Sequence, residues 1–466
     1  MTETLVVIGG DAGGMAAASQ ARRMRPDPAD LAIVGFERGT RTSFSACGIP
    51  FRVGGQVAEL DDLVARTPQE FRERQHIDVR TRHEVTAIDV DERIVHVTDL
   101  DGQRSFTQPF DQLLIGTGAR PIRPPLPGID LDFVHGVQNL DDADDLLHHA
   151  ETLRCENVVV VGGGYIGLEM AEAFVAWGAH VTVIEGGSQV MRTLDEDMAT
   201  LVAAAMQRHQ IELRVGTSVE GFEPGRVLTS DGPVDAQLVV LGIGVQANSE
   251  LARDAGIELG VKGAIRVDRR QRTSAEGVWA AGDCCESRHL ITGEPVHIAL
   301  GTVANRQARV AGINIGGGYA RADGVLGSAV TKLCGTEIGR TGMTVVEAEA
   351  AGFEVAVGRI ESSTRAGYYP GAEPITVKLV AEQGTGRLLG GQIVGGAGSA
   401  KRIDVVATAI TAGMTATDLE LTDFSYAPPF SPLWDPVLLA ARQAAKVARN
   451  AHRGVAPTPT DSAHVP

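Results

Sequence analysis

The chain has 466 residues, too many for one compact core, so its length predicts two to four domains. Its formal net charge of −17, without a basic stripe, argues against nucleic acid and anionic membrane surfaces as partners. It has no run of about 18 apolar residues that would span a membrane, and its five cysteines lack metal-type spacing, so we expect a cytoplasmic protein without a metal site or a disulfide framework.

One pattern occurs twice along the chain: an apolar run, a glycine cluster and an alanine-rich helical stretch. The first copy, LVVIGGDAGGMAAASQARR, begins at Leu5, and the second, VVVVGGGYIGLEMAEAFVAWG, begins at Val158. A further apolar run follows each copy and ends on an acid, Glu37 or Glu185. In a βαβ dinucleotide-binding unit the glycines let the backbone approach a pyrophosphate, the helix N-terminus faces it, and the acid binds a ribose. The repeat therefore predicts two Rossmann-like domains.

The two glycine clusters differ at one position. The second is a complete GxGxxG on Gly162, Gly164 and Gly167, whereas the first has Asp11 where the middle glycine belongs. Because a carboxylate that faces a pyrophosphate is unfavourable, we expect the side chain of Asp11 to point away from it.

Shorter blocks follow these two units. LLIGTGARP (113–121) is typical of a buried strand and a turn, and VWAAGDC (278–284) is typical of a strand that ends at Gly282 and Asp283. The segment that begins at Leu300 is typical of a helix capped by glycines. From about residue 325 the pattern changes to strands, at 375–380 and 388–396, and then to helices, at 401–413 and 437–449. This change predicts a third, α+β domain, and the tail at 451–466 is rich in proline and expected to be disordered.

In this order, the blocks resemble the pyridine nucleotide–disulfide oxidoreductase superfamily over the chain to about residue 445. The resemblance implies an α/β fold with two Rossmann-like dinucleotide-binding domains and a C-terminal α+β dimerisation domain that forms a homodimer. The expected boundaries are 1–148 and 245–321 for the FAD-binding domain, 149–244 for the NAD(P)H-binding domain, 322–450 for the dimerisation domain and 451–466 for the tail.

The same resemblance implies two cofactors, FAD at the first glycine cluster and NAD(P)H at the second. Glu185 is followed by Gly-Gly-Ser with no arginine immediately placed to bind a 2′-phosphate, so we expect NADH over NADPH. Tyr165 is expected to gate the nicotinamide pocket, and Glu169 to lie near the nicotinamide or the flavin edge. The residues expected to bind the cofactors are Gly9, Ala12, Gly13, Glu37, Arg38, Ser43, Thr117, Gly118, Gly282, Asp283, Ala299, Thr302, Gly162, Gly164, Tyr165, Ile166, Gly167, Glu169, Glu185 and Gly244.

A single cysteine, Cys47, occupies the segment SFSACGIPF. Reductases of this family with two active cysteines carry them four residues apart at this place. A segment with one cysteine resembles the branch of coenzyme A disulfide reductases, NADH oxidases and NADH peroxidases. In that branch the cysteine cycles as thiolate, mixed disulfide or sulfenic acid. Oxidases and peroxidases of that branch have a histidine where this chain has Ala12, which favours the disulfide reductases. The alternative is that Cys47 is a small buried core residue, as we expect for Cys284 and Cys285.

Two tyrosine blocks, YYPGAEP and FSYAPPF, resemble those that disulfide reductases of this branch bring to the cysteine of the partner subunit. Tyr368 and Tyr426 are therefore expected to protonate a departing thiolate, with Tyr369 as a substitute for the first, unless these tyrosines only pack a dimer interface. Arginines that end the first predicted helix, Arg22 and Arg23, are expected to bind coenzyme A phosphates, unless that helix end is merely solvated. The expected substrate-binding residues are Gln20, Arg23, Ser43 and Tyr369.

The expected function is that of an FAD-dependent NAD(P)H:disulfide oxidoreductase that reduces a small disulfide or persulfide, with coenzyme A disulfide leading, through a mixed disulfide on Cys47. Alternatives are an NADH oxidase or peroxidase, a ferredoxin-type NADH-dependent electron-transfer flavoprotein, and a redox-responsive flavoprotein that binds a partner. Ala46, Arg52 and Trp434 depart from the pattern of the branch and leave the identity of the disulfide open.

Overall fold

The computed structural model describes residues 2–451, so most of the tail expected to be disordered (452–466) lies outside the described residues. The chain divides into two compact units. Unit 1 comprises the residues up to Gly162 together with Met170–Ile184 and Thr217–Val325. Unit 2 comprises Gly163–Glu169, Glu185–Gly216 and the residues from Leu326 onward.

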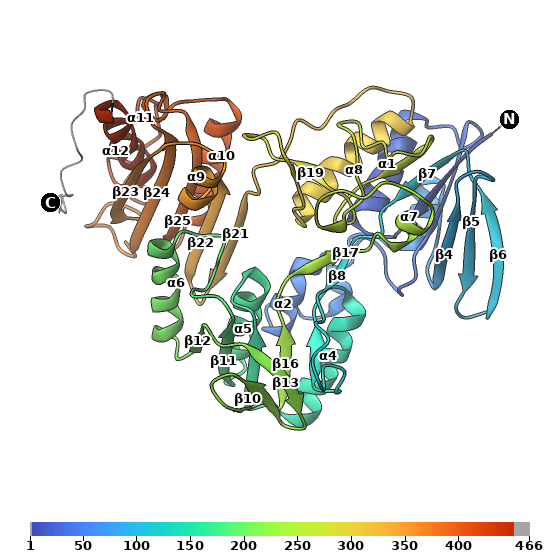
Figure 1. Ribbon diagram of the computed structural model, residues 1–466, viewed down its shortest axis with the longest axis horizontal. Helices are drawn as coiled ribbons and strands as arrows, with labels where there is room; N and C mark the ends of the chain where they lie inside the picture. The colour runs from blue at the N-terminus through green and yellow to red at the C-terminus, as the bar shows by residue number, and fades with distance from the viewer. Residues whose placement is uncertain (1, 452–466) are drawn as a thin grey trace. The chain divides into compact units, whose positions relative to one another are not determined.

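A parallel five-stranded sheet forms the first part of unit 1 (Figure 1). Its order is β18 (Val278–Ala280), β7 (Gln112–Ile115), β1 (Glu3–Ile8), β2 (Leu31–Phe36) and β3 (Ile77–Arg80). Apart from β3, these strands are largely apolar, as expected for a parallel sheet that is covered on both faces. Helices α1 (Ala12–Met24) and α8 (Gly301–Ile315) lie over one face and share a core with β1. The antiparallel sheet of β4 (His83–Asp89), β5 (Ile94–Asp99) and β6 (Arg104–Pro109) supplies core residues to the other.

The second parallel sheet of unit 1 repeats this plan. Its strands run in the order β11 (His180–Glu185), β10 (Asn157–Val161), β16 (Leu238–Leu241) and β9 (Val134–Gly136). Helix α5 (Tyr165–Ala176) follows β10 as α1 follows β1. The apolar residues of β10 and β16 are buried, so both halves of the repeat fold as the sequence predicts. The fold class predicted from the duplicated glycine clusters is confirmed.

Short elements complete unit 1. The remaining strands are β8 (Ala119–Pro121), β13 (Val219–Glu223), β14 (Arg226–Thr229), β15 (Val234–Asp235), β17 (Val245–Ala247), β19 (Ser287–Arg288) and β20 (Pro295–Val296). The remaining helices are α2 (Ile49–Val53), α3 (Pro68–Gln75), α4 (Leu140–Leu153) and α7 (Glu250–Asp254), with 3-10 turns at Ala46–Gly48, Leu60–Leu63 and Val261–Gly263.

Unit 2 is built on an antiparallel five-stranded sheet. Its order is β21 (Ala329–Leu333), β22 (Thr336–Gly342), β25 (Leu388–Gly395), β24 (Pro374–Glu382) and β23 (Val355–Ser363). Helix α12 (Pro436–Ala451) crosses β23 closely, because a Cβ on Gly358 would lie 2.2 Å from the carbonyl oxygen of Ala440. The other elements are α6 (Glu196–Arg208), β12 (Glu212–Val215), α9 (Val345–Ala350), a 3-10 turn (Ala400–Arg402), α10 (Ile403–Thr411) and α11 (Ala416–Glu420). This is the α+β architecture predicted for the C-terminal part.

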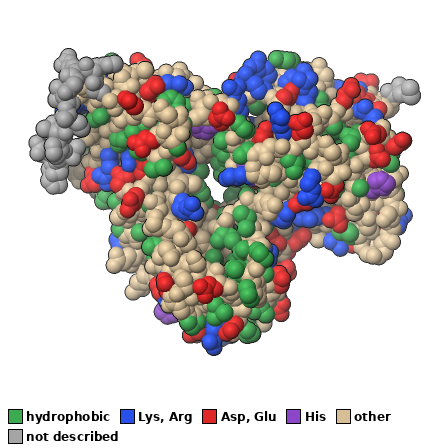
Figure 2. All heavy atoms as spheres, viewed as in Figure 1, with side chains coloured by type: hydrophobic (Ala, Val, Ile, Leu, Met, Phe, Trp, Pro, Cys, Tyr) green, Lys and Arg blue, Asp and Glu red, His purple; other side chains and the backbone are tan. Residues whose placement is uncertain are grey.

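Acidic and basic side chains are interspersed over the face drawn in Figure 2, in keeping with the mixed composition. Within residues 2–451, no helix has the length and apolar character that a membrane crossing requires.

Candidate functional site

The turn between β1 and α1 is shaped by glycines that no other residue could replace. Gly9 has a φ of +104°, and a Cβ there would lie 2.1 Å from the carbonyl oxygen of Gly116 at the end of β7. A Cβ on Gly13 would lie 2.6 Å from the carbonyl oxygen of Ala281, just after β18. Three strand ends thus meet the start of α1, where the first amides of the helix have no acceptor inside it. This geometry suits a pyrophosphate.

Glu37, at the end of β2, is held beside this turn by two backbone amides. Its Oε2 accepts from Gly10 N–H at 2.6 Å and its Oε1 from Gly39 N–H at 2.7 Å. The second glycine cluster reproduces the arrangement: Glu185 accepts from Gly163 N–H at 2.9 Å and from Gly187 N–H at 2.7 Å. Each glutamate bridges the glycine turn and the loop after its strand, at the position where the sequence expects a ribose.

The end of β18 and the start of α8 close the first turn. Gly282 has a φ of +91°, and its amide donates to Oε1 of Gln307 on α8 at 3.0 Å. Burial raises the pKa of the neighbouring Asp283, and Nε2 of His297 lies 2.7 Å from the backbone carbonyl oxygen of Asp283. The predicted residues Ala299 and Thr302 flank Gly301, where α8 begins. Backbone amides for a pyrophosphate and carboxylates for hydroxyl groups fit the FAD that the sequence predicts.

Thr117 and Gly118 follow β7 and are fixed by one asparagine. Thr117 Oγ1 donates to the carbonyl oxygen of Asn248 at 2.5 Å, and Asn248 Nδ2 donates back to the carbonyl oxygen of Thr117 at 2.9 Å. Gly118 and the predicted Gly244 both have positive φ angles, +66° and +99°. Arg38, also predicted to bind the cofactor, is exposed directly after Glu37.

The segment that carries Cys47 is pinned on two sides. On one side, Ser43 N–H donates to the carbonyl oxygen of Gly10 at 2.9 Å, and Phe44 N–H donates to Oδ1 of Asp11 at 3.0 Å. On the other side, Ala65 N–H donates to the carbonyl oxygen of Ser43 at 2.8 Å. Ser43 itself has a φ of +49°, an uncommon conformation for a residue with a side chain. The Cys47 segment is therefore attached directly to the first glycine turn.

Cys47 lies in the 3-10 turn Ala46–Gly48, which leads into α2, and it is exposed. The alternative that it is a buried core residue is therefore wrong. Cys155, Cys284 and Cys285 are buried and Cys334 is half-buried, and none of the five cysteines, all within residues 2–451, forms a disulfide. The adjacent residues Cys284 and Cys285 both pack in the core. The hydrogen bond between their thiols and their burial raise the pKa of Cys285. Cys47 is thus the most exposed of the five cysteines.

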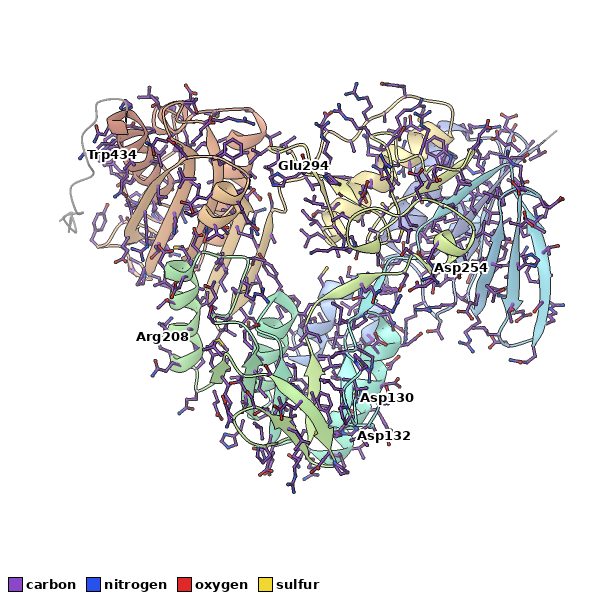
Figure 3. All side chains as sticks on the ribbon, viewed as in Figure 1. Asp130, Asp132, Arg208, Asp254, Glu294 and Trp434 are labelled. Atoms are coloured by element: carbon purple, nitrogen blue, oxygen red, sulfur yellow. The ribbon has the colours of Figure 1, made fainter. Side chains whose placement is uncertain are left out.

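The two predicted tyrosines come together in unit 2. The hydroxyl of Tyr368 is bonded to that of Tyr426 and raises its pKa, and both side chains are exposed, by 78% and 44%. Tyr369 is half-buried beside them in sequence. Phe430, Leu433 and Trp434 are further exposed apolar side chains that follow Tyr426 in the chain. Trp434, labelled in Figure 3, has the guanidinium of Arg442 4.6 Å above its ring.

Arg22 is not available for substrate, which corrects the sequence prediction. Its guanidinium is buried and donates to backbone carbonyl oxygens, among them those of Gln75 at 2.9 Å, His76 at 3.1 Å and Leu31 at 2.8 Å. These carbonyls include the last of α3, so Arg22 completes the C-terminus of that helix. Arg23 is exposed and bonds to Gln20 Oε1 at 3.2 Å, which keeps these two predicted substrate-binding residues together.

An arginine does lie near the loop after β11, contrary to the expectation that none is placed there. A Cβ on Gly187 would lie 3.0 Å from Cδ of Arg192 and 3.0 Å from Oε1 of Glu185. Met191 has a φ of +47°, so the backbone turns back at this point. Arg192 is exposed. The sequence alone does not show this proximity, because it depends on the turn at 191–194, which contains Arg192 and in which Leu194 N–H donates to the carbonyl oxygen of Met191 at 2.7 Å.

Tyr165 and Glu169, at the start of α5, are both engaged within unit 2. Burial raises the pKa of Tyr165, and its hydroxyl lies 3.4 Å from Oγ1 of Thr193. Glu169 Oε1 accepts from Oγ1 of Thr331 on β21 at 2.8 Å. The predicted Gly162, Gly164, Ile166 and Gly167 surround this helix start, and Gly162 has the same φ as Gly9, +104°.

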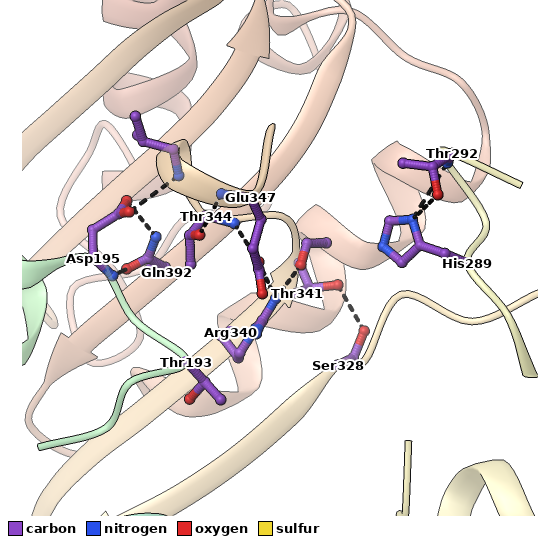
Figure 4. Close-up of polar contacts among 12 residues, drawn as sticks. Thr193, Asp195, His289, Thr292, Ser328, Arg340, Thr341, Thr344, Glu347 and Gln392 are labelled. Carbon is purple, nitrogen blue, oxygen red and sulfur yellow. Dashed lines mark hydrogen bonds and ion pairs between the residues drawn. The ribbon is translucent and has the colours of Figure 1, made fainter. Parts of the chain in front are cut away.

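The loop after β11 ends in a buried network of ion pairs and hydrogen bonds (Figure 4). Asp195, just before α6, contacts Nζ of Lys378 on β24 at 2.9 Å and accepts from Gln392 Nε2 on β25 at 2.7 Å. Its backbone amide donates to Gln392 Oε1 at 2.8 Å, and its Oδ1 accepts from Val345 N–H at 3.0 Å. Nζ of Lys378 also forms an ion pair with Oδ1 of Asp197 at 2.7 Å. The network therefore attaches the end of the loop after β11 to the sheet of unit 2.

The chain matches known proteins over nearly all of its length. The pyridine nucleotide-disulphide oxidoreductase family matches residues 3–308, and the dimerisation domain of such enzymes matches residues 328–436. An NAD(P)H coenzyme A polysulfide/persulfide reductase of Pyrococcus horikoshii is 40% identical over 447 residues, 95% of this chain and 98% of the relative. An NADH oxidase of Methanocaldococcus jannaschii is 38% identical over 452 residues, 96% of this chain and 99% of the relative. A solved NAD-dependent persulfide reductase from A. fulgidus has a TM-score of 0.91 and 39% identity, and the match covers 97% of this chain and 84% of that one.

Proposed function

The chain belongs to the pyridine nucleotide-disulphide oxidoreductase family, and we propose that it uses Cys47 to reduce a small disulfide or persulfide, with coenzyme A derivatives as the leading substrates. It is an oxidoreductase that acts on sulfur groups, uses FAD and NAD(P)H and has the dimerisation domain of a homodimer. The observation that carries the proposal is the exposed Cys47, attached through Ser43 and Phe44 to the turn that fits FAD. We further propose that the enzyme works in the cytoplasm.

The chemistry of the chain centres on the sulfur of Cys47. The thiolate attacks one sulfur of the substrate, so a Cys47–S–S–R bond forms and the R–S⁻ group leaves and takes a proton. Bound FAD supplies the two electrons, taken from NAD(P)H, that cleave this mixed disulfide. The second thiol leaves, and Cys47 is again a thiolate. One NAD(P)H and one proton are consumed for each disulfide that becomes two thiols.

The relative named NADH oxidase makes oxygen reduction the second candidate function. Against it stands Ala12 at the start of α1, where the sequence resemblance places a histidine in oxidases and peroxidases. Intact mass spectrometry after treatment with coenzyme A disulfide tests the choice. The expected result is one coenzyme A adduct on Cys47, removed by NADH. Rapid oxygen consumption by an enzyme that forms no adduct would reject the proposal.

The tyrosine pair is proposed to protonate the thiolate that leaves Cys47 of the partner subunit. Tyr426→Phe and Tyr368→Phe are each expected to lower kcat for disulfide reduction at least ~10-fold, because a positioned hydroxyl acts as general acid. Reduction of FAD by NADH, measured by stopped-flow absorbance, should not change. Tyr319→Phe is the matched control, since Tyr319 is an exposed tyrosine that stacks under Arg270 in unit 1. Equal activity of all three variants would remove the tyrosines from the mechanism.

For the electron donor we propose NADH, with NADPH accepted through Arg192. A charged hydrogen bond to the 2′-phosphate is worth about 1.5–3 kcal/mol, so Arg192→Ala should raise KM for NADPH roughly 10-fold or more and leave KM for NADH unchanged. Arg208→Ala is the control, because Arg208 is an exposed arginine on α6 of the same unit (Figure 3). Steady-state kinetics with both donors decide the point. An equal effect on both donors would assign Arg192 a structural role.

A further inference from the structure

Asp11 occupies a position that the dinucleotide motif reserves for glycine, and the function proposed above gives it no role. It directly precedes α1, yet its side chain does not cap that helix in the manner of an ordinary N-cap acid. Instead, Oδ1 of Asp11 accepts Phe44 N–H at 3.0 Å, three residues before Cys47. One residue earlier, Ser43 N–H donates to the carbonyl oxygen of Gly10. The turn before α1 and the Cys47 segment therefore run side by side, joined by consecutive amides.

From this geometry we propose that Asp11 is a positioning residue for Cys47, whose carboxyl group holds the Cys47 segment against the turn that receives FAD. The inference rests on the proposed function, in which Cys47 is the redox group. The Ser43 backbone, with its φ of +49°, needs such a restraint, because an isolated chain rarely adopts that conformation. Without Asp11, the amide of Phe44 would lose its acceptor and the start of the segment would be free to open.

The surroundings of Asp11 also disfavour its ionised form. Desolvation raises its pKa to about 7, and the negative charges of Glu37 at the end of β2 and Asp283 after β18 act in the same direction. The amides of Phe44 and Ala12 oppose them. Burial raises the pKa of Asp283, and His297, in the loop between β20 and α8, opposes that rise. Three carboxyl groups thus meet at one turn, and the pKa of Asp11 lies near neutral pH.

A pH dependence of the attachment follows from this raised pKa. The reference pKa of the acid is 3.8, and the folded value is about 7. Opening that exposes Asp11 to water releases its proton in the range between these two values. The closed segment is therefore fully stable below this range, loses stability as pH rises toward 7, and changes little above it. From pH 5 to pH 7, the opening equilibrium should grow roughly 50-fold.

Amide hydrogen exchange of Phe44 in the FAD-loaded, reduced enzyme tests the proposal without any substrate. In Asp11→Gly, which restores the glycine of the motif, exchange of the segment 43–48 should accelerate at least ~10-fold. Asp11→Asn keeps an oxygen acceptor for Phe44 N–H and should restore protection to within about 3-fold. After correction for base catalysis, protection should fall with pH in the wild type and stay constant in Asp11→Asn.

Asp111→Asn is the matched control, because Asp111 also accepts a backbone amide in unit 1, that of Thr4 at 2.7 Å. It should leave exchange of the segment 43–48 unchanged. Exchange of Phe44 at the rate of a free peptide in the wild type would overturn the proposal even if a variant failed to fold. Equal protection in the wild type and Asp11→Gly would overturn it as well. Neither result depends on coenzyme A, so failure of the proposed substrate remains a separate outcome.

Discussion

Replacing Cys47 with serine is expected to lower kcat for reduction of coenzyme A disulfide by at least ~1,000-fold, because serine supplies no comparable nucleophile and cannot form a mixed disulfide. Reduction of FAD by NADH should stay within about 3-fold of the wild-type rate, since the turn that fits FAD keeps all its contacts. Stopped-flow absorbance of the flavin and steady-state release of thiol measure the two half-reactions separately. Loss of both would indicate a damaged fold rather than a missing nucleophile.

The control for this experiment is Cys334→Ser. Cys334 is half-buried and, like Cys47, forms no disulfide, but it lies in unit 2 on the turn between β21 and β22. Its replacement should leave thiol release unchanged. If Cys47→Ser retained disulfide turnover and Cys334→Ser lost it, the assignment of Cys47 as the nucleophile would be wrong.

The second large effect concerns stability. Lys378→Met is expected to destabilise the protein by about 3–5 kcal/mol, because it leaves the carboxylate of Asp195 buried without its cation. Both side chains are nearly inaccessible, with 9% and 6% of their surface exposed. Urea unfolding followed by tryptophan fluorescence measures the change. A matched loss in affinity for NAD(P)H is expected, because Asp195 ends the loop that begins at Glu185.

Glu361→Gln provides the comparison for this variant. Glu361 pairs with Arg359 at 3.0 Å on the same sheet, but its side chain is 69% exposed. An exposed pair of this kind contributes little, so the change should stay within ~0.5 kcal/mol. A similar loss in both variants would show that burial does not govern the Lys378 network.

The sequence predicts the two glycine turns well because they are local. The conformations of Gly9 and Gly162, and the acids Glu37 and Glu185, follow from a motif that fits within one βαβ unit.

Contacts between distant segments were not predictable in this way. The sequence predicts Arg22 to be a cation at the end of a helix that is open to a ligand. Its actual partners, the carbonyl oxygens of Gln75 and His76, lie at the end of another helix more than 50 residues away. Arg192 is hidden by a reversal of the chain at Met191. Asp11 was expected only to avoid a pyrophosphate, and its actual partner, Phe44, lies 33 residues away. In each case the decisive group is a backbone or side chain that tertiary packing supplies.

The two amides that hold Glu185 limit how the donor preference of this enzyme could be engineered. Both oxygens of Glu185 already accept a backbone N–H, from Gly163 and from Gly187, so the side chain cannot swing aside for a 2′-phosphate. Replacement by glutamine would set an NH₂ group against one of these amides and leave a donor without an acceptor. A redesign for NADPH therefore has to rebuild the turn and the loop together, and exchanging the acid alone would cost affinity for both donors.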